Sequence, residues 1–310
     1  MAPTQPVKRG NGNATGGIEM RKHFKDVLIK IAEKDEKLIL LLGDISVFLL
    51  KDFADRFPDR FYNIGICENT LISMAAGMSS QNLHPIVHTI APFITERSYE
   101  QVKLDMCYNG FGGNIVSCGG SFDYAWDGAT HHCYTDLELM RMLPGMEVMQ
   151  PGSKKELGLL LESQYANGKP SYFRIPADEH LLDLPVEFGK ANVVLHKDSA
   201  KLTVITAGPL LNNVYEACKD MNVNLLYFHT IKPLDAEVLA RYSKTKMLVI
   251  HDAFGLFESV CATVDSKVKY HGIPDKFCCY YGTLEDIRRL LMLDAAGIKN
   301  IIQKELSGIK

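Results

Sequence analysis

Apolar residues recur at two spacings along the chain, and the two spacings alternate. Residues 18–34 carry apolar side chains at helical intervals, and the all-apolar run 38–42 then predicts a buried strand. Strands alternating with helices are typical of a mostly parallel sheet covered by helices on both faces, so the predicted fold class is α/β. The remaining elements predicted for the first part of the chain are strands at 61–66 (buried), 85–90, 114–118, 147–150 and 172–175, and helices at 69–80, 98–108 and 154–165.

The alternation breaks around residues 176–201, where prolines and acidic residues predict a solvated connector. A smaller α/β unit follows, with strands predicted at 202–206, 223–228 and 247–251. The chain is therefore divided into two domains, residues 18–180 and 201–310, each expected to be a mostly parallel sheet with helices on both faces, joined by a linker at 181–200. Residues 1–17 are rich in small and polar residues and predict a disordered tail, although two adjacent cations leave a targeting segment open.

Composition excludes several classes of function. The 310 residues carry a net charge of -3 and no basic run, so we expect no nucleic-acid or anionic-membrane partner. No apolar stretch approaches the roughly 18–20 residues needed to span a bilayer. The eight cysteines form no CxxC pair, which argues against a metal or redox site and favours reduced thiols in a cytoplasmic protein.

The most informative stretch is residues 57–80, FPDRFYNIGICENTLISMAAGMSS. Glu68 lies just beyond a predicted strand, where a helix begins. Ligands gather at the carboxyl ends of strands in open parallel sheets. Taken alone, however, a glutamate at a helix start can simply complement the positive end of the helix dipole.

Residues 57–68 resemble the pyrimidine-binding domain of the transketolase family, which includes 1-deoxyxylulose-5-phosphate synthase. The resemblance implies that Glu68 contacts the aminopyrimidine ring of thiamine diphosphate. A carboxyl group there promotes the imino form of the cofactor, whose own nitrogen removes the thiazolium proton. The C-terminal segments 229–239, 249–257 and 280–298 resemble the third domain of the same group, so the likeness spans residues 18–305.

The resemblance also implies further site residues. Phe93 and Tyr99 match family aromatics beneath the pyrimidine, although both types are common in ordinary cores. In WDGATHH, Asp127 matches the residue that recognises a donor hydroxyl, and His131 matches one that assists proton transfer. An isolated DxxxH is equally compatible with an ion pair or metal ligands. His132 stands where a glutamine is common in the family.

Two departures concern the substrate. Arg174 in PSYFRIP matches a family arginine and is a candidate phosphate clamp. The family cation that precedes Asp127 is absent, and the only tryptophan, Trp126, takes the place of a small acidic residue. The chain thus has one of the two cations that the family uses to bind substrate and lacks the other. This difference suggests a substrate that is bulkier or less phosphorylated.

The family holds the cofactor diphosphate through magnesium (Mg2+) with a GDG…N motif, which this chain lacks. The resemblance therefore implies an N-terminal-type partner subunit carrying that motif, in an α2β2 heterotetramer acting on small sugars. The chain is thus interpreted as the C-terminal subunit of a split transketolase, moving a two-carbon ketol unit from a ketose to an aldehyde. The alternatives are a 2-oxo-acid dehydrogenase beta-type subunit, a decarboxylating carboligase, and a silent regulatory subunit.

Overall fold

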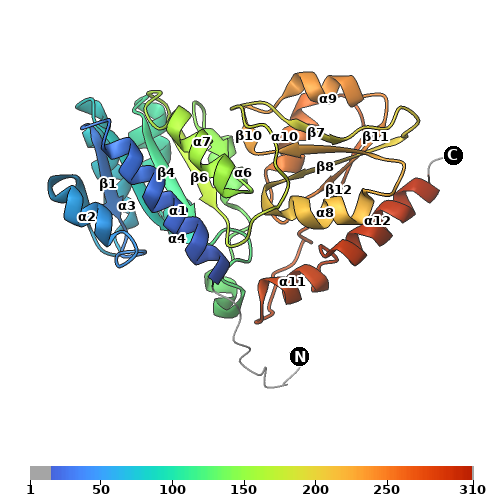
Figure 1. The fold of residues 1–310 in the computed structure, drawn as a ribbon, viewed down its shortest axis with the longest axis horizontal. Helices are drawn as coiled ribbons and strands as arrows, with labels where there is room; N and C mark the ends of the chain where they lie inside the picture. The colour runs from blue at the N-terminus through green and yellow to red at the C-terminus, as the bar shows by residue number, and fades with distance from the viewer. Residues whose placement is uncertain (1–14, 309–310) are drawn as a thin grey trace.

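The computed structural model describes residues 15–308, which form two sheets side by side, each flanked by helices (Figure 1). Residues 1–14 of the tail predicted at 1–17 lie outside the described residues. Helix α1 begins at Thr15, within the last three residues of that predicted tail. The first sheet has seven strands in the order β10-β5-β6-β4-β3-β1-β2. Its strands are β1 (Leu38–Leu42), β2 (Phe61–Asn63), β3 (His84–Ile90), β4 (Gly113–Cys118), β5 (Glu147–Met149), β6 (Pro170–Ile175) and β10 (Thr230–Lys232).

Four neighbouring strands of this sheet, β1, β3, β4 and β6, run parallel and in close register. Leu42 pairs with His88, and Cys118 pairs with both Ile90 and Ile175. The strands therefore end at one edge of the sheet, and the loops that follow them converge there. This edge is where a ligand site is expected in an open parallel sheet.

Helices cover both faces of the first sheet, as predicted. Strand β1 shows this directly, because Leu40 packs into one apolar cluster and Leu41 into the other, with neither side chain exposed. One face carries α1 (Thr15–Ala32), α2 (Lys51–Arg56) and α7 (Lys154–Gln164). The other carries α3 (Glu68–Ser80), α4 (Ala91–Thr95), α5 (Tyr99–Gln101), the π-helical η2 (Val102–Tyr108) and α6 (Asp136–Met142).

The second sheet has five strands in the order β12-β11-β8-β9-β7. Its strands are β7 (Asn192–Leu195), β8 (Leu202–Ala207), β9 (Asn224–Phe228), β11 (Lys246–Ile250) and β12 (Val268–His271). The α-helices of this unit are α8 (Leu211–Cys218), α9 (Ala236–Tyr242), α10 (Leu256–Thr263), α11 (Leu284–Leu290) and α12 (Ala295–Ser307). Short 3-10 turns occur at η1 (Pro58–Arg60), η3 (Ala125–Thr130) and η4 (Gly208–Leu210).

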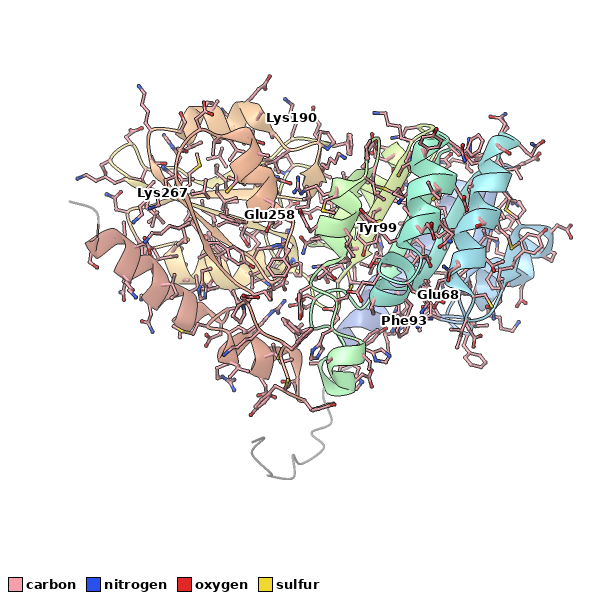
Figure 2. The ribbon with its side chains drawn as sticks, turned by 180° about the vertical axis from the view of Figure 1, so that it is seen from behind. Glu68, Phe93, Tyr99, Lys190, Glu258 and Lys267 are labelled. Carbon is pink, nitrogen blue, oxygen red and sulfur yellow. The ribbon has the colours of Figure 1, made fainter. Side chains whose placement is uncertain are left out.

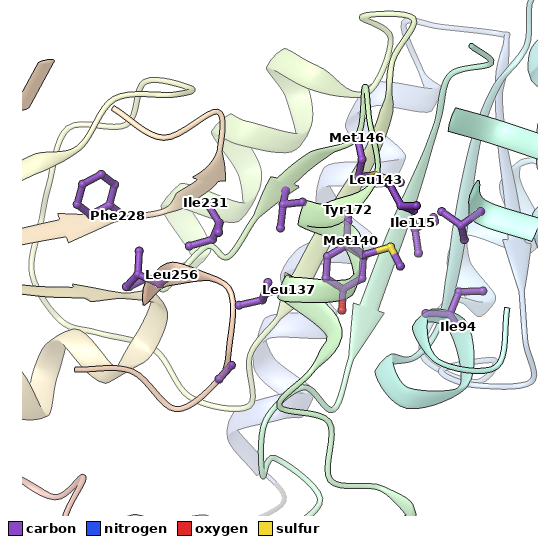
Figure 3. Close-up of a cluster of buried hydrophobic side chains, with 14 of the residues drawn as sticks. Ile94, Ile115, Leu137, Met140, Leu143, Met146, Tyr172, Phe228, Ile231 and Leu256 are labelled. Carbon is purple, nitrogen blue, oxygen red and sulfur yellow. The ribbon is translucent and has the colours of Figure 1, made fainter. Parts of the chain in front are cut away.

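The two sheets share one hydrophobic core. Leu137 and Met140 of α6 belong to the same buried cluster as Phe228 and Leu256 of the second unit (Figure 3). In addition, β10, from the C-terminal part of the chain, pairs antiparallel with β5 and extends the first sheet. The two units are therefore packed into each other rather than only linked.

Three details differ from the sequence prediction. The segment 181–200 was expected to be a linker, but it contains β7, which pairs antiparallel with β9 at a sheet edge. Strand β2 is half-exposed rather than buried, because it has a single neighbour, β1. The helix predicted at 98–108 is divided into α5 and η2. Within residues 15–308, no helix is long and apolar enough to cross a membrane.

Candidate active site

Glu68 is the first residue of α3, at the edge where the parallel strands end. A turn with Gly65 at φ 81° leads into the helix, and no side chain caps its N-terminus. The Glu68 side chain is only 1% exposed. Its Oε2 accepts a hydrogen bond of 2.9 Å from Nη1 of Arg97, while its Oε1 is buried without a hydrogen-bond partner among the described residues. A buried carboxylate oxygen left unpaired is costly and is therefore a candidate ligand contact.

Phe93 connects Glu68 to the loop that carries the predicted catalytic histidine. Phe93 lies on α4, half-buried, and the Arg97 guanidinium lies 4.5 Å from the centre of its ring. On the other side, the His131 ring approaches edge-on, with centroids 5.3 Å apart. Glu68, Arg97, Phe93 and His131 therefore form a continuous series of contacts, and Figure 2 shows Glu68 and Phe93 at the same edge.

The loop after β4 places Asp127 and His131 on the short helix η3 and just beyond it. Asp127 is exposed, and its carboxylate makes no hydrogen bond within the described part of the chain. His131 is half-buried, and its Nδ1 lies 2.9 Å from Oγ1 of Thr130. Between them, Gly128 adopts φ 74° and packs against Tyr281, so a Cβ at Gly128 would lie 2.4 Å from the Tyr281 ring.

The structure does not bring Tyr99 into this series. Tyr99 packs against the shared core, and in Figure 2 it lies away from Glu68 and Phe93. Burial raises the pKa of Tyr99, and Cys107 and Glu138 add to the shift. Its predicted contact with the pyrimidine has no support from this geometry.

Arg174 also lies apart from the exposed site residues, contrary to the predicted phosphate clamp. It is 2% exposed, and its Nε donates to Asp136 Oδ2 at 2.8 Å while its Nη2 donates to Asp136 Oδ1. Asp136 is itself fully buried. The guanidinium is thus already committed to a carboxylate of its own chain, because strand β6 points it at the start of α6 rather than at the sheet edge.

His132 is buried as well, unlike its neighbour His131. Its Nε2 lies 3.4 Å from the Ala125 carbonyl oxygen, and its ring packs edge-on against Phe122. Burial lowers the pKa of His132.

The residue that the sequence reasoning missed is Arg97, which donates a hydrogen bond to Glu68 and lies over the Phe93 ring. Its position four residues after Phe93, one helical turn away, was the available signal.

The residues at this edge fit one end of thiamine diphosphate. The unpaired Oε1 of Glu68 is a hydrogen-bond acceptor suited to a protonated ring nitrogen, or a donor when protonated, and Phe93 provides an apolar surface beside it. For the diphosphate end, residues 15–308 contain no group of three His, Cys, Asp or Glu side chains that could hold a metal ion. Asp44, in the Gly43-Asp44 pair, accepts a hydrogen bond from Asn63 instead.

Comparison with known proteins defines the class of this molecule. The family described as the transketolase pyrimidine-binding domain matches residues 16–180, and the chain belongs to that family. The chain is 29% identical over 304 residues to a subunit of the apulose-4-phosphate transketolase of Phocaeicola vulgatus, covering 92% of this chain and 96% of that protein. It is 27% identical over 299 residues to the 1-deoxy-D-xylulose-5-phosphate synthase of Mannheimia succiniciproducens, covering 91% of this chain but 48% of the synthase.

These lengths identify the kind of chain within the class. The chain spans about half of the full-length synthases it matches, and nearly all of the apulose-4-phosphate transketolase subunit. Among solved structures, a split-gene transketolase described as an inactive beta4 tetramer superposes with a TM-score of 0.80 at 24% identity, covering 93% of this chain and 98% of that one. In length and fold the chain therefore matches the C-terminal type of subunit of a split transketolase, as the sequence indicated.

Proposed function

We propose that this subunit provides the cofactor-activating half of a ketol-transfer site. The observation that carries the proposal is the buried Oε1 of Glu68, which has no partner within the described chain; the same carboxylate is connected through Arg97 to the Phe93–His131 pair. Thiamine diphosphate, when bound, supplies the carbanion chemistry that lets a two-carbon ketol unit leave one sugar and join another. In this role Glu68 hydrogen-bonds the pyrimidine ring and shares a proton with it.

The exposed residues of the neighbouring loop act on the substrate in this proposal. Asp127 accepts a hydrogen bond from a donor hydroxyl, and His131 carries protons at the substrate oxygens. The donor bond between its C2 and C3 breaks and an equivalent bond forms to the acceptor aldehyde carbon. The proton released by the C3 hydroxyl of the donor is balanced by the proton taken up at the new hydroxyl, so no oxidant is needed.

A partner subunit is part of the same proposal. We infer that an N-terminal-type chain presents the diphosphate and magnesium to Glu68, in an α2β2 heterotetramer. The description of the structurally similar beta4 tetramer as inactive supports this requirement. The eight free cysteines support a cytoplasmic location.

The proposal is tested by reconstituting the subunit with its partner, thiamine diphosphate and magnesium. Glu68→Gln keeps the size of the side chain but cannot share a proton, so we expect kcat to fall by about 10²–10⁴-fold, the usual range for general acid–base groups. Hydrogen–deuterium exchange at the thiazolium C2 should slow in parallel, which separates cofactor activation from substrate binding. Glu100→Gln, an exposed change on α5, is the matched control.

Three other outcomes would contradict the proposal. Normal C2 exchange in Glu68→Gln would remove Glu68 from cofactor activation. Decarboxylation of 2-oxo acids without ketol transfer would assign the subunit to a dehydrogenase or carboligase. No turnover with either class of donor would leave only a regulatory role.

A further inference from the structure

A row of aromatic rings leads away from Glu68 along the mouth of the site. Phe93 contacts His131, the His131 and Tyr124 centroids are 6.2 Å apart, and Tyr124 and Trp126 are 5.7 Å apart, all edge-on. The row ends at Trp126, which is 45% exposed and directly precedes Asp127. A substrate whose reacting carbon lies near His131 would therefore extend its remote end toward Trp126.

A second aromatic side chain, Tyr281, approaches this segment from the other domain. Tyr281 packs on Gly128, two residues from Trp126, and is 56% exposed. The segment that carries Asp127 is thus flanked by Trp126 and Tyr281, which we call the aromatic wall. Binding sites for uncharged organic groups are commonly lined in this way, with a few polar groups to fix orientation.

The charges behind the wall disfavour a phosphate. Both arginines there are ion-paired: Arg174 with Asp136, and Arg288 with Asp178, while Asp252 lies within 4 Å of both guanidinium groups. Three carboxylates, Asp136, Asp178 and Asp252, lie around the two guanidinium groups, whereas burial raises the pKa of the neighbouring Asp123 carboxyl. A sugar phosphate carries about two negative charges near pH 7, so beside these two ion-paired arginines it would meet more carboxylates than guanidinium groups.

The turn before the wall offers only backbone. A Cβ at Gly119 would lie 2.4 Å from the Tyr124 ring, and a Cβ at Gly120 would lie 2.4 Å from Nε of Arg174. No side chain can therefore reach the site from these positions. Burial raises the pKa of the Tyr124 hydroxyl, and Arg21 lies close enough for its positive charge to oppose that rise. The Arg21 side chain donates hydrogen bonds to the Gly17 carbonyl oxygen and to Oγ of Ser46.

We infer that the subunit selects substrates whose remote end is uncharged and packs on Trp126, namely unphosphorylated aldehydes and ketoses with an apolar or ring face. This inference rests on the proposed ketol transfer and concerns only the substrate class. Trp126 is its specificity-determining residue, with Tyr281 as the second side of the wall.

The test uses the reconstituted heteromeric complex and paired substrates that differ only in the phosphate. With L-erythrulose as donor, kcat/KM for D-glyceraldehyde should exceed that for D-glyceraldehyde 3-phosphate by at least about tenfold, and benzaldehyde should also be accepted. Trp126→Ala should raise KM for benzaldehyde by about tenfold with little change in kcat, and Trp126→Phe should restore most of the loss. Trp126→Arg should shift the preference toward the phosphorylated aldehyde.

Binding is also measured without turnover. Trp126 is the only tryptophan of the chain, so the benzaldehyde-dependent fluorescence change of the wild-type complex should be larger than that of the Trp126→Phe complex, and the difference reports contact with Trp126. A tenfold preference for the phosphorylated aldehyde, or an unchanged KM in Trp126→Ala, would overturn the inference while leaving ketol transfer intact. Absence of transfer from every ketose would instead overturn the proposed function.

Discussion

The Arg174–Asp136 pair provides a direct test of whether Arg174 is structural. Asp136 is fully buried and accepts hydrogen bonds from Arg174 and from the Tyr172 hydroxyl at 2.6 Å. Asp136→Asn keeps the shape but leaves the buried Arg174 charge with only the more distant Asp252 carboxylate, 3.9 Å away, as a counter-ion. Removing one partner of a buried pair typically costs about 3–5 kcal/mol, so we expect a loss of that size in the free energy of unfolding.

The assay is urea unfolding followed by circular dichroism, with the midpoint and slope compared between variants. Glu138→Gln is the matched control, because Glu138 lies on the same helix and pairs with Arg141, yet both side chains are 22% exposed. That pair should contribute less than about 1 kcal/mol. Replacing both buried partners, Arg174→Met with Asp136→Leu, should recover most of the loss, because both charges of this pair are then removed and Asp252 keeps Arg288 as its partner.

An Asp136→Asn cost as small as that of Glu138→Gln would refute the reasoning. It would mean that Arg174 is not held by Asp136 and is free to turn toward a substrate phosphate. In that case the family-like clamp would return, and the inferred preference for unphosphorylated substrates would lose its main electrostatic argument.

Two further predictions concern single residues. Gly128→Ala should destabilise the protein more than Gly145→Ala in urea unfolding. Both positions have positive φ, but only a Cβ at Gly128 would contact Tyr281. Equal losses of unfolding free energy would show that the Tyr281 side chain moves away at no cost. Burial lowers the pKa of His88 to about 4, so the folded form resists protonation and stability is lost as the pH falls below the unfolded value near 6.5. His88→Asn should therefore reduce the loss of unfolding free energy between pH 7 and pH 5 by about 2 kcal/mol. Parallel pH curves for His88→Asn and wild type would contradict the shift.

The alternation of apolar runs was enough to predict the parallel core of the fold. Residues 38–42 are all apolar because β1 has neighbours on both sides and helices on both faces, and the structure gives the same bounds. Edge strands were harder to predict. β2 was predicted as a buried strand but is half-exposed, and β7 was assigned to a linker because it follows a segment rich in prolines and acidic residues.

The site was partly predictable for a similar reason. Glu68, Phe93 and His131 lie close to strand ends, and the sheet register determines where strand ends meet. Arg97 was missed because its role depends on which side chain it covers, and periodicity does not specify that contact. Tyr99 was included because of its position in a motif, although the helix turns it toward the core.

Arg174 shows most clearly what a motif leaves open. A motif fixes the place of a residue on strand β6 but not the partner that the next layer presents to it. Here Asp136 at the start of α6 binds the guanidinium, and Gly120 packs directly against it. The same contacts that remove this cation from the surface also exclude a replacement side chain from the turn. The ion pair that holds Arg174 and the lack of room for a side chain at Gly120 are therefore one structural feature rather than two independent ones.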